Sequence, residues 1–401
     1  MTAGRGGNRA DAANGKRGNM NVERSVDTSA HAQQITFIAA GDCGPVHGPK
    51  DGFPIGRYTE RVRPTLQSVD LRFGNCERQY SSRGSPSERA PHGCQPPEMA
   101  QIFTDCGFDA VTIANNHMYD FGPEAMLDTR ALLLEKGIAV TGAGRNLQEA
   151  RQPAIVTRNG IKVGMLGYCS VLPHGAEAGP AKPGIAQLRI NTSYDTRGPH
   201  APVRVFTAPH DADMQIILDD VSALRKEVDI VIVAFHWGMV WVPRIVCDYQ
   251  ITAAHACIDA GADMILGHHA HVPKAIEVYK GKAIFYSLAN LCMTKPFPSA
   301  AWAEPPWTHG ALRNHVDQDP AYPLLPYGSH AKRSLLAKAA FSKSGVSRVS
   351  FLPMMIDTLY RPNVLYANAP EFEDMVRYME WTSDGFDHKF EIRGDEVVVS
   401  S

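Results

Sequence analysis

The sequence lacks any long apolar run. No stretch of about 18 or more consecutive apolar residues occurs in the 401 residues, so no transmembrane helix is predicted. The first 34 residues also lack the apolar core of a secretory signal. Their polar composition predicts a disordered tail over residues 1–34. These absences favour a cytoplasmic protein.

An excess of charge of one sign is lacking as well. Lys and Arg number 40 and Asp and Glu number 42, and the resulting net charge of −2 argues against binding nucleic acid through bulk charge. The eight cysteines form no C-x-x-C pair, so we expect reduced thiols and no disulfide framework. Apolar residues make up 44% of the chain, which is enough to build a sizeable core.

Short apolar runs alternate with segments that carry apolar residues at helical spacing. The runs are typical of strands, and the segments between them are typical of helices. The strand-like runs are residues 35–40, 71–74, 110–114, 229–235 and 262–266. The helix-like segments are residues 97–106, 123–137, 212–227 and 248–260. This alternation predicts parallel β–α–β units.

Two hairpins interrupt this alternation. Their turns are predicted at Asn159–Gly160 and at Lys280–Gly281. Further strands are expected at Val346–Ile356 and Glu396–Val399. We therefore predict a mixed α/β fold, with one central mixed sheet or a two-sheet sandwich flanked by helices. Two stretches rich in Pro, Gly, His and Trp, residues 171–211 and 293–335, are predicted to be long functional loops.

Polar residues able to bind a metal ion follow five of the predicted strands. Alone, each has an ordinary explanation as a turn, a helix cap or a structural histidine. Because the carboxyl ends of parallel strands line one crevice, the five endings together predict a metal site. Carboxylate, amide and imidazole ligands suit one or two Mn²⁺, Fe²⁺ or Zn²⁺ ions, with Ca²⁺ less natural. The endings are Asp42, Glu77, Asn116–His117, His236 and His268–His269–Ala270–His271.

The same segments resemble the bacterial capsule-synthesis family, the CapA-type or PGA_cap proteins of poly-γ-glutamate synthesis. That family belongs to the calcineurin-like metallophosphoesterase superfamily. The resemblance implies a two-sheet β-sandwich flanked by helices over residues 35–360, with residues 361–401 as an extension that packs on it. Its motifs are Gly41–Asp42, Asn75–Glu77, Ala114–His117 with Asp120, His236–Gly238, Gly267–Val272 and Phe285–Asn290.

The resemblance also implies roles for single residues. The metal-shell residues would be Asp42, Glu77, Asn116, His236, His269 and His271. His117 would act as general acid or base, and Asp120 would orient it, support it from behind or cap the next helix. In an extended chain His269 and His271 point to the same side, so His268 is expected to point away or to support the ligands.

The chain departs from the wider superfamily pattern at two positions. That pattern opens with D-x-H, whereas here Asp42 is followed by Cys43 and Gly44. Glu77 stands where the pattern has a bridging aspartate. One imidazole ligand is therefore missing, and both changes argue against ordinary two-metal phosphatase activity.

Three functions follow as hypotheses. The first is a soluble hydrolase that acts on an amide, peptide-like or phosphoester substrate through a metal-activated water. The second resembles the lasso-peptide epimerases, with His117 on one side of an α-carbon and His236 or His268 on the other. The third is a non-catalytic capsule accessory protein. The expected partner is a small molecule or peptide, and the oligomeric state is left open.

Several further side chains are candidates for substrate contact. Arg78 and Lys182 could pair with a substrate carboxylate or could be ordinary surface charges. Trp237 and Trp241 follow the strand that ends in His236 and are expected to form one wall. Aromatic residues of the second long loop could contact the substrate or simply bury the loop; they are Phe297, Trp302, Trp307 and Tyr322.

Overall fold

The computed structural model shows two main β-sheets with helices packed against them. The described residues are Met1, 34–46, 48, 52–87, 94–196, 198–200, 203–294, 319–325 and 327–401. The chain divides into a unit of residues 1–32 and a unit of residues 33–401, and all the described helices and strands lie in the second. The predicted tail lies outside the described residues except for its two end positions. None of the described helices is both long and apolar enough to cross a bilayer.

The larger sheet has ten strands. Four parallel strands form one half: β1 (Ile35–Gly44), β2 (Leu71–Cys76), β3 (Ala110–Thr112) and β4 (Ala139–Thr141). Antiparallel strands form the other half: β16 (Arg333–Ser342), β17 (Gly345–Ile356), β18 (Pro362–Val364), β19 (Lys389–Arg393) and β20 (Glu396–Ser400). The order is β19-β20-β17-β16-β1-β2-β3-β4, and β15 (Asn290–Met293) also pairs with β1.

The second sheet has six strands in the order β13-β14-β12-β11-β7-β6. They are β6 (Ala154–Arg158), β7 (Ile161–Cys169), β11 (Ile230–His236), β12 (Met264–His268), β13 (Ile276–Tyr279) and β14 (Lys282–Phe285). Both predicted hairpins are confirmed. Asn159 and Gly160 have φ values of 47° and 71°, as a two-residue turn with left-handed backbone requires.

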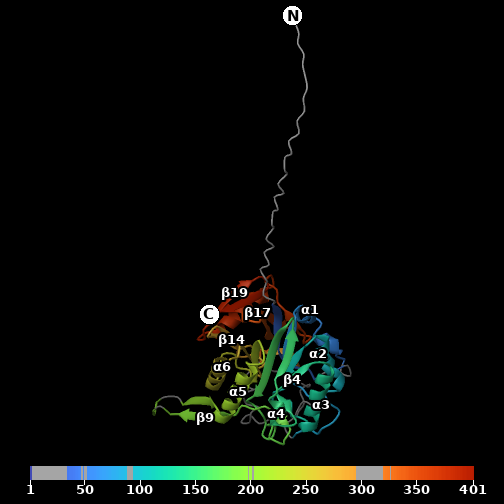
Figure 1. The fold of residues 1–401 in the computed structure, drawn as a ribbon, viewed down its shortest axis with the longest axis vertical. Coiled ribbons are helices and arrows are strands. Elements are labelled where there is room, and N and C mark those ends of the chain that lie inside the picture. Colours follow the sequence, from blue (N-terminus) through green and yellow to red (C-terminus); the bar gives the residue numbers. More distant parts are fainter. Residues whose placement is uncertain are drawn as a thin grey trace, which may run out of the picture. The chain divides into compact units, whose positions relative to one another are not determined.

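The two sheets pack face to face. Alternate residues of each strand point to opposite faces, so Phe37 and Phe73 share one core with Ile232 and Met264. The outer face of the larger sheet is covered by α1 (Arg63–Gln67), the 3₁₀ helices η2 (Ile55–Tyr58) and η3 (Pro97–Ala100), α2 (Gln101–Asp105) and α3 (Gly122–Glu135). The outer face of the smaller sheet is covered by α5 (Asp211–Leu224) and α6 (Asp248–Asp259) (Figure 1). The predicted mixed α/β two-sheet architecture is confirmed.

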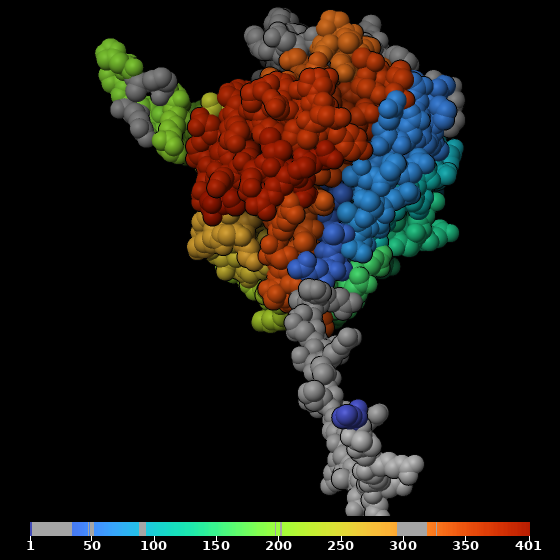
Figure 2. All heavy atoms as spheres, turned by 90° about the horizontal axis from the view of Figure 1, so that it is seen from above, coloured from blue at the N-terminus to red at the C-terminus, as the bar shows by residue number. Residues whose placement is uncertain are grey.

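The segment 171–211, predicted to be a long loop, contains three short strands. The segment contains β8 (Gly184–Ile185), which pairs with β5 (Ala143–Gly144) next to α4 (Leu147–Ala150). It also contains β9 (Ile190–Asp195) and β10 (Arg204–Pro209), a hairpin that forms its own two-stranded sheet. Figure 2 shows this hairpin, in green, projecting from the body of the protein. Because β9 is mostly exposed, it carries no apolar alternation that a sequence pattern could reveal.

The other two predicted segments have different outcomes. Most of the stretch 293–335, with Phe297, Trp302 and Trp307, lies outside the described residues, and β15 and β16 take up its two ends. The segment 361–401 holds β18, α8 (Pro370–Ser383), β19 and β20. Met375 and Met379 of α8 belong to the core between the sheets, where Phe351 of β17 also lies.

Candidate metal centre

The polar strand ends meet at one edge of the sandwich. Asp42 lies near the end of β1 and Glu77 directly after β2, its parallel neighbour. His236 and His268 end β11 and β12, which are also parallel neighbours in the other sheet. The carboxyl ends of all four strands therefore face one place, as the topology rule requires.

Asp42 is fully buried and carries four polar contacts. Its Oδ1 accepts a hydrogen bond from Asn75 Nδ2 at 2.9 Å and lies 3.1 Å from Nδ1 of His268. Its Oδ2 accepts a hydrogen bond from the backbone N–H of His269 at 3.1 Å and lies 3.5 Å from Nδ1 of His271. Burial alone raises the pKa of this carboxyl, but the hydrogen bond and charge of His268, with His236 and His271, lower it below its ordinary value. The Asp42 side chain is therefore ionised at neutral pH.

Glu77 faces three imidazoles with one oxygen. Its Oε1 lies 3.7 Å from Nε2 of His271, 3.9 Å from Nε2 of His236 and 4.0 Å from Nε2 of His117. These four side chains come from segments up to 194 positions apart (271 minus 77). A buried carboxylate surrounded by imidazole nitrogens is an arrangement that a shared cation stabilises.

The ring of His236, which lies on the smaller sheet, contacts side chains that extend from both sheets. Its Nε2 lies 2.7 Å from Oδ1 of Asn116 and 3.1 Å from Nδ1 of His269, while its Nδ1 lies 3.3 Å from Nδ2 of Asn75. Burial lowers the pKa of His236 well below its ordinary value, and the neighbouring His269 lowers it further. The ring is therefore neutral at neutral pH, and neutral imidazole is the form that binds a metal ion.

The residues present fit a divalent cation. One ligand atom from each of Asp42, Glu77 and His271 lies within 4.8 Å of the others, and all three side chains are buried. Since metal–ligand bonds are about 2.0–2.3 Å long, such a triangle is small enough for one ion to touch each member after small side-chain shifts. His236 and Asn116 lie beside this triangle and extend it. Mixed oxygen and imidazole donors suit Mn²⁺, Fe²⁺ or Zn²⁺.

His117 and Asp120 form a pair at the rim. Nδ1 of His117 lies 2.8 Å from Oδ2 of Asp120, and both side chains are partly exposed. Asp120 does not cap the following helix, because α3 begins after Phe121 without any side-chain cap. The carboxylate instead holds the imidazole so that its Nε2 points toward Glu77.

The three histidines at the end of β12 and directly after it all reach the centre, but not in the expected way. His269 and His271 have φ values of 88° and 57°, so the chain turns there and is not extended. This turn, and not strand alternation, directs both rings inward. His268 does not point away. Its Nδ1 contacts Asp42, and its buried Nε2 has no hydrogen-bond partner among the described residues.

Two asparagines that the sequence motifs include, but to which no role was assigned, orient the candidate ligands. Asn75 bridges Asp42 and His236, and it accepts a hydrogen bond from Asn115 at 3.0 Å. Asn290 lies opposite Asp42 across β1 and β15, with its Oδ1 2.8 Å from Nδ1 of His271. This contact orients the His271 ring so that its Nε2 faces Oε1 of Glu77, 3.7 Å away. Asn75 stands in the same motif as Glu77, and this position is the sequence signal that could have given it a role at the site.

The aromatic candidates divide into structural and site-lining residues. Trp237 is buried and stacks on Phe235, so it is a core residue. Tyr322 donates a hydrogen bond to the carbonyl of Ile356 and packs on the core. Tyr327, which no sequence signal indicated, stacks on His271 with ring centroids 4.2 Å apart, and Trp241 packs near it. The C-terminal part of the segment 293–335 therefore packs against the centre at His271.

The two cationic side chains that were candidates for substrate contact lie in different environments. Lys182 is paired with Glu177 at 3.0 Å. Arg78 is not a surface charge, since only 1% of it is exposed. Its Nε donates to the carbonyl of Gly44, and its two terminal nitrogens have no hydrogen-bond partner among the described residues. A Cβ on Gly44 would lie 2.6 Å from Cγ of Arg78, so Arg78 fills the space that a side chain at position 44 would take.

Comparison with known proteins gives consistent matches. Residues 18–295 match the model of a family described as bacterial capsule synthesis protein PGA_cap. The PGA biosynthesis protein CapA of Bacillus subtilis is 30% identical over 252 residues, which cover 59% of this chain and 60% of that protein. A probable polyglutamine synthesis accessory protein of Mycobacterium tuberculosis is 30% identical over 229 residues, 56% of either chain. The chain thus spans between half and two thirds of the length of these relatives.

A solved structure gives a weaker match. The calcineurin-like phosphoesterase YfkN from Bacillus subtilis covers 87% of this chain and 96% of its own, at 13% identity and a TM-score of 0.40.

Proposed function

Because this chain belongs to the bacterial capsule synthesis family PGA_cap, as its motifs predicted, we propose that it is a metal-dependent hydrolase of an amide or peptide-like bond. The observation that carries the proposal is the buried triangle of Asp42, Glu77 and His271, with His236 and Asn116 beside it. A divalent cation held there supplies Lewis acidity, which lowers the pKa of water and polarises a carbonyl or phosphoryl group.

The protein's own residues divide the remaining work. His117 lies at the partly exposed rim with its Nε2 toward the ligands, so it is placed to give a proton to a leaving group. Asp120 holds that ring by its Nδ1 and stabilises its protonated form. Asn75 and Asn290 keep His236 and His271 in fixed orientations. His268 holds Asp42 from behind.

An amide substrate is preferred over a phosphoester for two reasons. The relatives are named for the synthesis of PGA and polyglutamine, whose units are joined by amide bonds. Gly44 and Arg78 also occupy the place where the wider phosphoesterase pattern has an imidazole ligand. With one imidazole ligand fewer, the site favours a single cation over the two-metal clamp that phosphatases use.

The test combines metal analysis with two kinds of substrate. Protein purified without chelator is assayed with γ-glutamyl-p-nitroanilide and with p-nitrophenyl phosphate. We expect about one metal equivalent and release of p-nitroaniline. His117→Asn should lower kcat by about 100-fold while the metal content stays unchanged. His255→Asn is the matched control, because His255 also pairs with a carboxylate, Glu277 at 2.8 Å, but lies on α6.

Other results would point elsewhere. Metal-free protein, or metal-loaded protein that cleaves neither substrate, would contradict the hydrolase and favour an accessory role. Turnover of the phosphate compound alone would assign a phosphoesterase. A cytoplasmic site of action stays a prediction.

One observation supports epimerisation as a second candidate. The centre holds two histidine–carboxylate pairs, His117 with Asp120 and His268 with Asp42. Inversion at an α-carbon needs one acid–base group on each face of that carbon. The signature would be incorporation of one deuterium from heavy water at an α-carbon of a peptide whose amide bonds all stay intact.

A further inference from the structure

A pocket of about 620 Å³ lies beside the metal centre, at the end of β7. Its inner wall begins at Cys169 and Ser170. Cys169 is the register partner of His236 on β11, and the backbone N–H of Ser170 donates to the carbonyl of His236 at 3.0 Å. The pocket therefore begins one strand, roughly 5 Å, from a residue of the centre.

A hydrogen-bonded chain also connects the two sites. The hydroxyls of Ser170 and Tyr249 lie 2.9 Å apart. The Tyr249 hydroxyl accepts a hydrogen bond from the backbone N–H of Gly238 at 2.6 Å, and Gly238 is two residues after His236. The wall of the pocket and the loop that follows His236 are thus fixed to each other.

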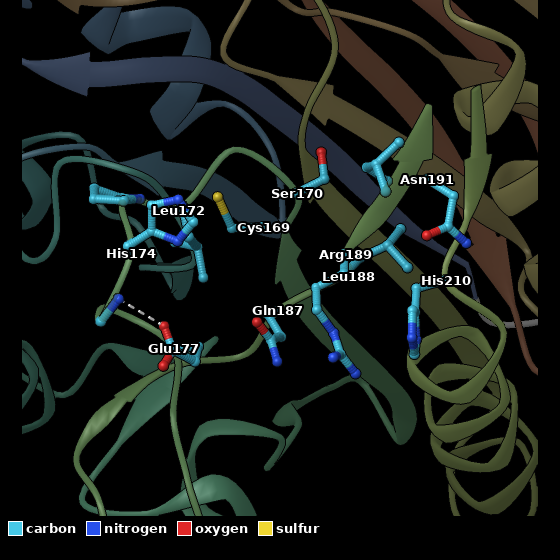
Figure 3. A pocket seen from close by; sticks show the side chains of 13 residues that line it. Cys169, Ser170, Leu172, His174, Glu177, Gln187, Leu188, Arg189, Asn191 and His210 are labelled. Carbon is cyan, nitrogen blue, oxygen red and sulfur yellow. Dashed lines mark hydrogen bonds between the residues drawn. The ribbon is translucent and has the colours of Figure 1, made fainter. Parts of the chain in front are cut away.

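The pocket carries opposite charges on opposite walls. Figure 3 shows Glu177 on one side, and Arg189 and His210 on the other. Glu177 accepts one hydrogen bond on each oxygen, from Lys182 and from the backbone N–H of Gly175, which leaves lone pairs on both. Its carboxylate can therefore accept another donor.

Arg189 has donors to spare as well. Its guanidinium gives two hydrogen bonds to Asp213, at 2.8 and 2.6 Å, out of five N–H groups. The side chain is 54% exposed, so the remaining donors can be reached. His210 is fixed next to it, because the backbone N–H of His210 donates to the carbonyl of Arg189. Its buried Nδ1 faces Oδ1 of Asp213 at 3.7 Å, while 34% of the His210 side chain is exposed.

Two side-chain amides complete the lining. Gln187 and Asn191 both line the pocket, and neither side chain forms a hydrogen bond within the described part of the chain. An amide offers one acceptor and two donors, which match the N–H and C=O of a peptide bond. Since each charged wall residue has its own counter-ion, the pocket has no excess charge that would attract a polyanion.

We propose that this pocket binds the zwitterionic end of a short peptide, with the ligand's amino group at Glu177 and its carboxylate at Arg189 and His210. The volume suits a dipeptide. The bound peptide would extend toward His236, so this assignment names the substrate class of the proposed hydrolase and rests on that function. It also makes the pocket a source of specificity separate from the metal ligands.

The test is calorimetric titration of the full chain, metal-loaded and metal-free, with γ-glutamylglycine. Two blocked forms of the dipeptide serve as further probes, one acetylated at the α-amino group and one amidated at the α-carboxyl of the same glutamyl residue. We expect each block to weaken binding about tenfold, because each removes one charge-assisted contact. Equal binding of all three forms, or no binding of the free dipeptide, would overturn the proposal.

Variants of the pocket test which wall binds the amino group of the ligand and which wall binds its carboxylate. Glu177→Gln should bind the free and acetylated dipeptides equally, and Arg189→Met should bind the free and amidated dipeptides equally. Arg393→Met is the matched control, since Arg393 also pairs with a carboxylate, Glu391 at 2.9 Å, but lies on β19. Pocket variants that discriminate as the wild type does would contradict the proposal. Arg189→Lys, which keeps the charge, covers the case in which Arg189→Met does not fold.

The two proposals fail in different ways. Dipeptide binding with the expected block sensitivity, but no hydrolysis, would remove the proposed function and leave the pocket. Hydrolysis whose KM is unaffected by Glu177→Gln and Arg189→Met would keep the function and remove the pocket.

Discussion

Lys274 has its whole side chain inside the protein, three positions after His271. Its ammonium donates to the carbonyl of Ile245, in the loop that follows β11. Burial lowers the pKa of Lys274 from 10.5 to about 8, and the nearby Cys247 acts weakly in the opposite direction. The charged form is therefore less stable inside the fold than in the unfolded chain.

This burial predicts a pH-dependent stability difference. Between pH 8 and 10.5 the unfolded chain binds more protons at Lys274 than the folded chain does, so this residue makes stability rise with pH in that window. Below pH 8 its full cost is present, about 3 kcal/mol at most for 2.5 pKa units (10.5 minus 8). Lys274→Met should be at least as stable as the wild type at pH 7, and this advantage should shrink by pH 10.

Urea unfolding at pH 7 and pH 10 measures the difference. Lys226→Met, at an exposed position after α5, provides the control. Its free energy of unfolding should differ from that of the wild type by the same small amount at both pH values. A difference for Lys274→Met that does not change with pH would contradict the argument.

At the scale of elements, the end of β12 depends on a close approach between two backbones. A Cβ on Gly267 would lie 2.1 Å from the carbonyl oxygen of Tyr286, and the backbone N–H of Leu288 donates to the carbonyl of Gly267. His268 follows directly and reaches Asp42. The position of the whole histidine cluster therefore depends on the missing side chain at 267.

Gly267→Ala should destabilise the protein by about 3 kcal/mol or more, because a fixed backbone atom stands in the way. It should also abolish metal binding. Gly160→Ala is the matched control: its φ is 71° with no atom within 4 Å of an added Cβ, so only backbone strain of about 1 kcal/mol is expected. Denaturant unfolding and metal content after dialysis check both variants. Equal costs, or unchanged metal binding in Gly267→Ala, would contradict this account.

Helices and strands were predictable from the sequence where burial left a pattern of apolar residues, either an uninterrupted run or a helical spacing. The strands that carry Asp42 and His236 are buried on both faces, and the turn at Asn159–Gly160 has the residues such a turn needs. The hairpin β9–β10 was not predictable, because solvent covers most of it and no core selects its residues. The left-handed backbone at His269 and His271 was equally hidden, since the strand rule assumes an extended chain.

At the scale of the molecule, the centre joins two sheets. Asp42 and Glu77 extend from β1 and β2 of the larger sheet, and His236 and His268 from β11 and β12 of the smaller one. Their convergence was predictable from a general rule about strand ends. The supporting contacts of Asn75 and Asn290 were not, because they depend on how the two sheets are placed against each other and on the register of β15.

A cation bound there should stabilise the join between the sheets. At a free metal concentration 100 times the Kd, binding adds about 2.7 kcal/mol to the stability of the folded state. Chelation should therefore lower the melting temperature of the wild type by several degrees. Asp42→Asn should melt at one temperature with or without chelator, because it removes the ligand that also holds His268 and Asn75.

Asp263→Asn is the control for this measurement. Asp263 is also a buried carboxylate, paired with Arg225 and Lys282, but it lies at the opposite end of β12. This variant should be less stable than the wild type and still lose further stability on chelation. A wild-type melting temperature that chelation leaves unchanged would mean that the hydrogen bonds of Asp42, Asn75 and His236 alone hold the two sheet edges together, without a contribution from a cation.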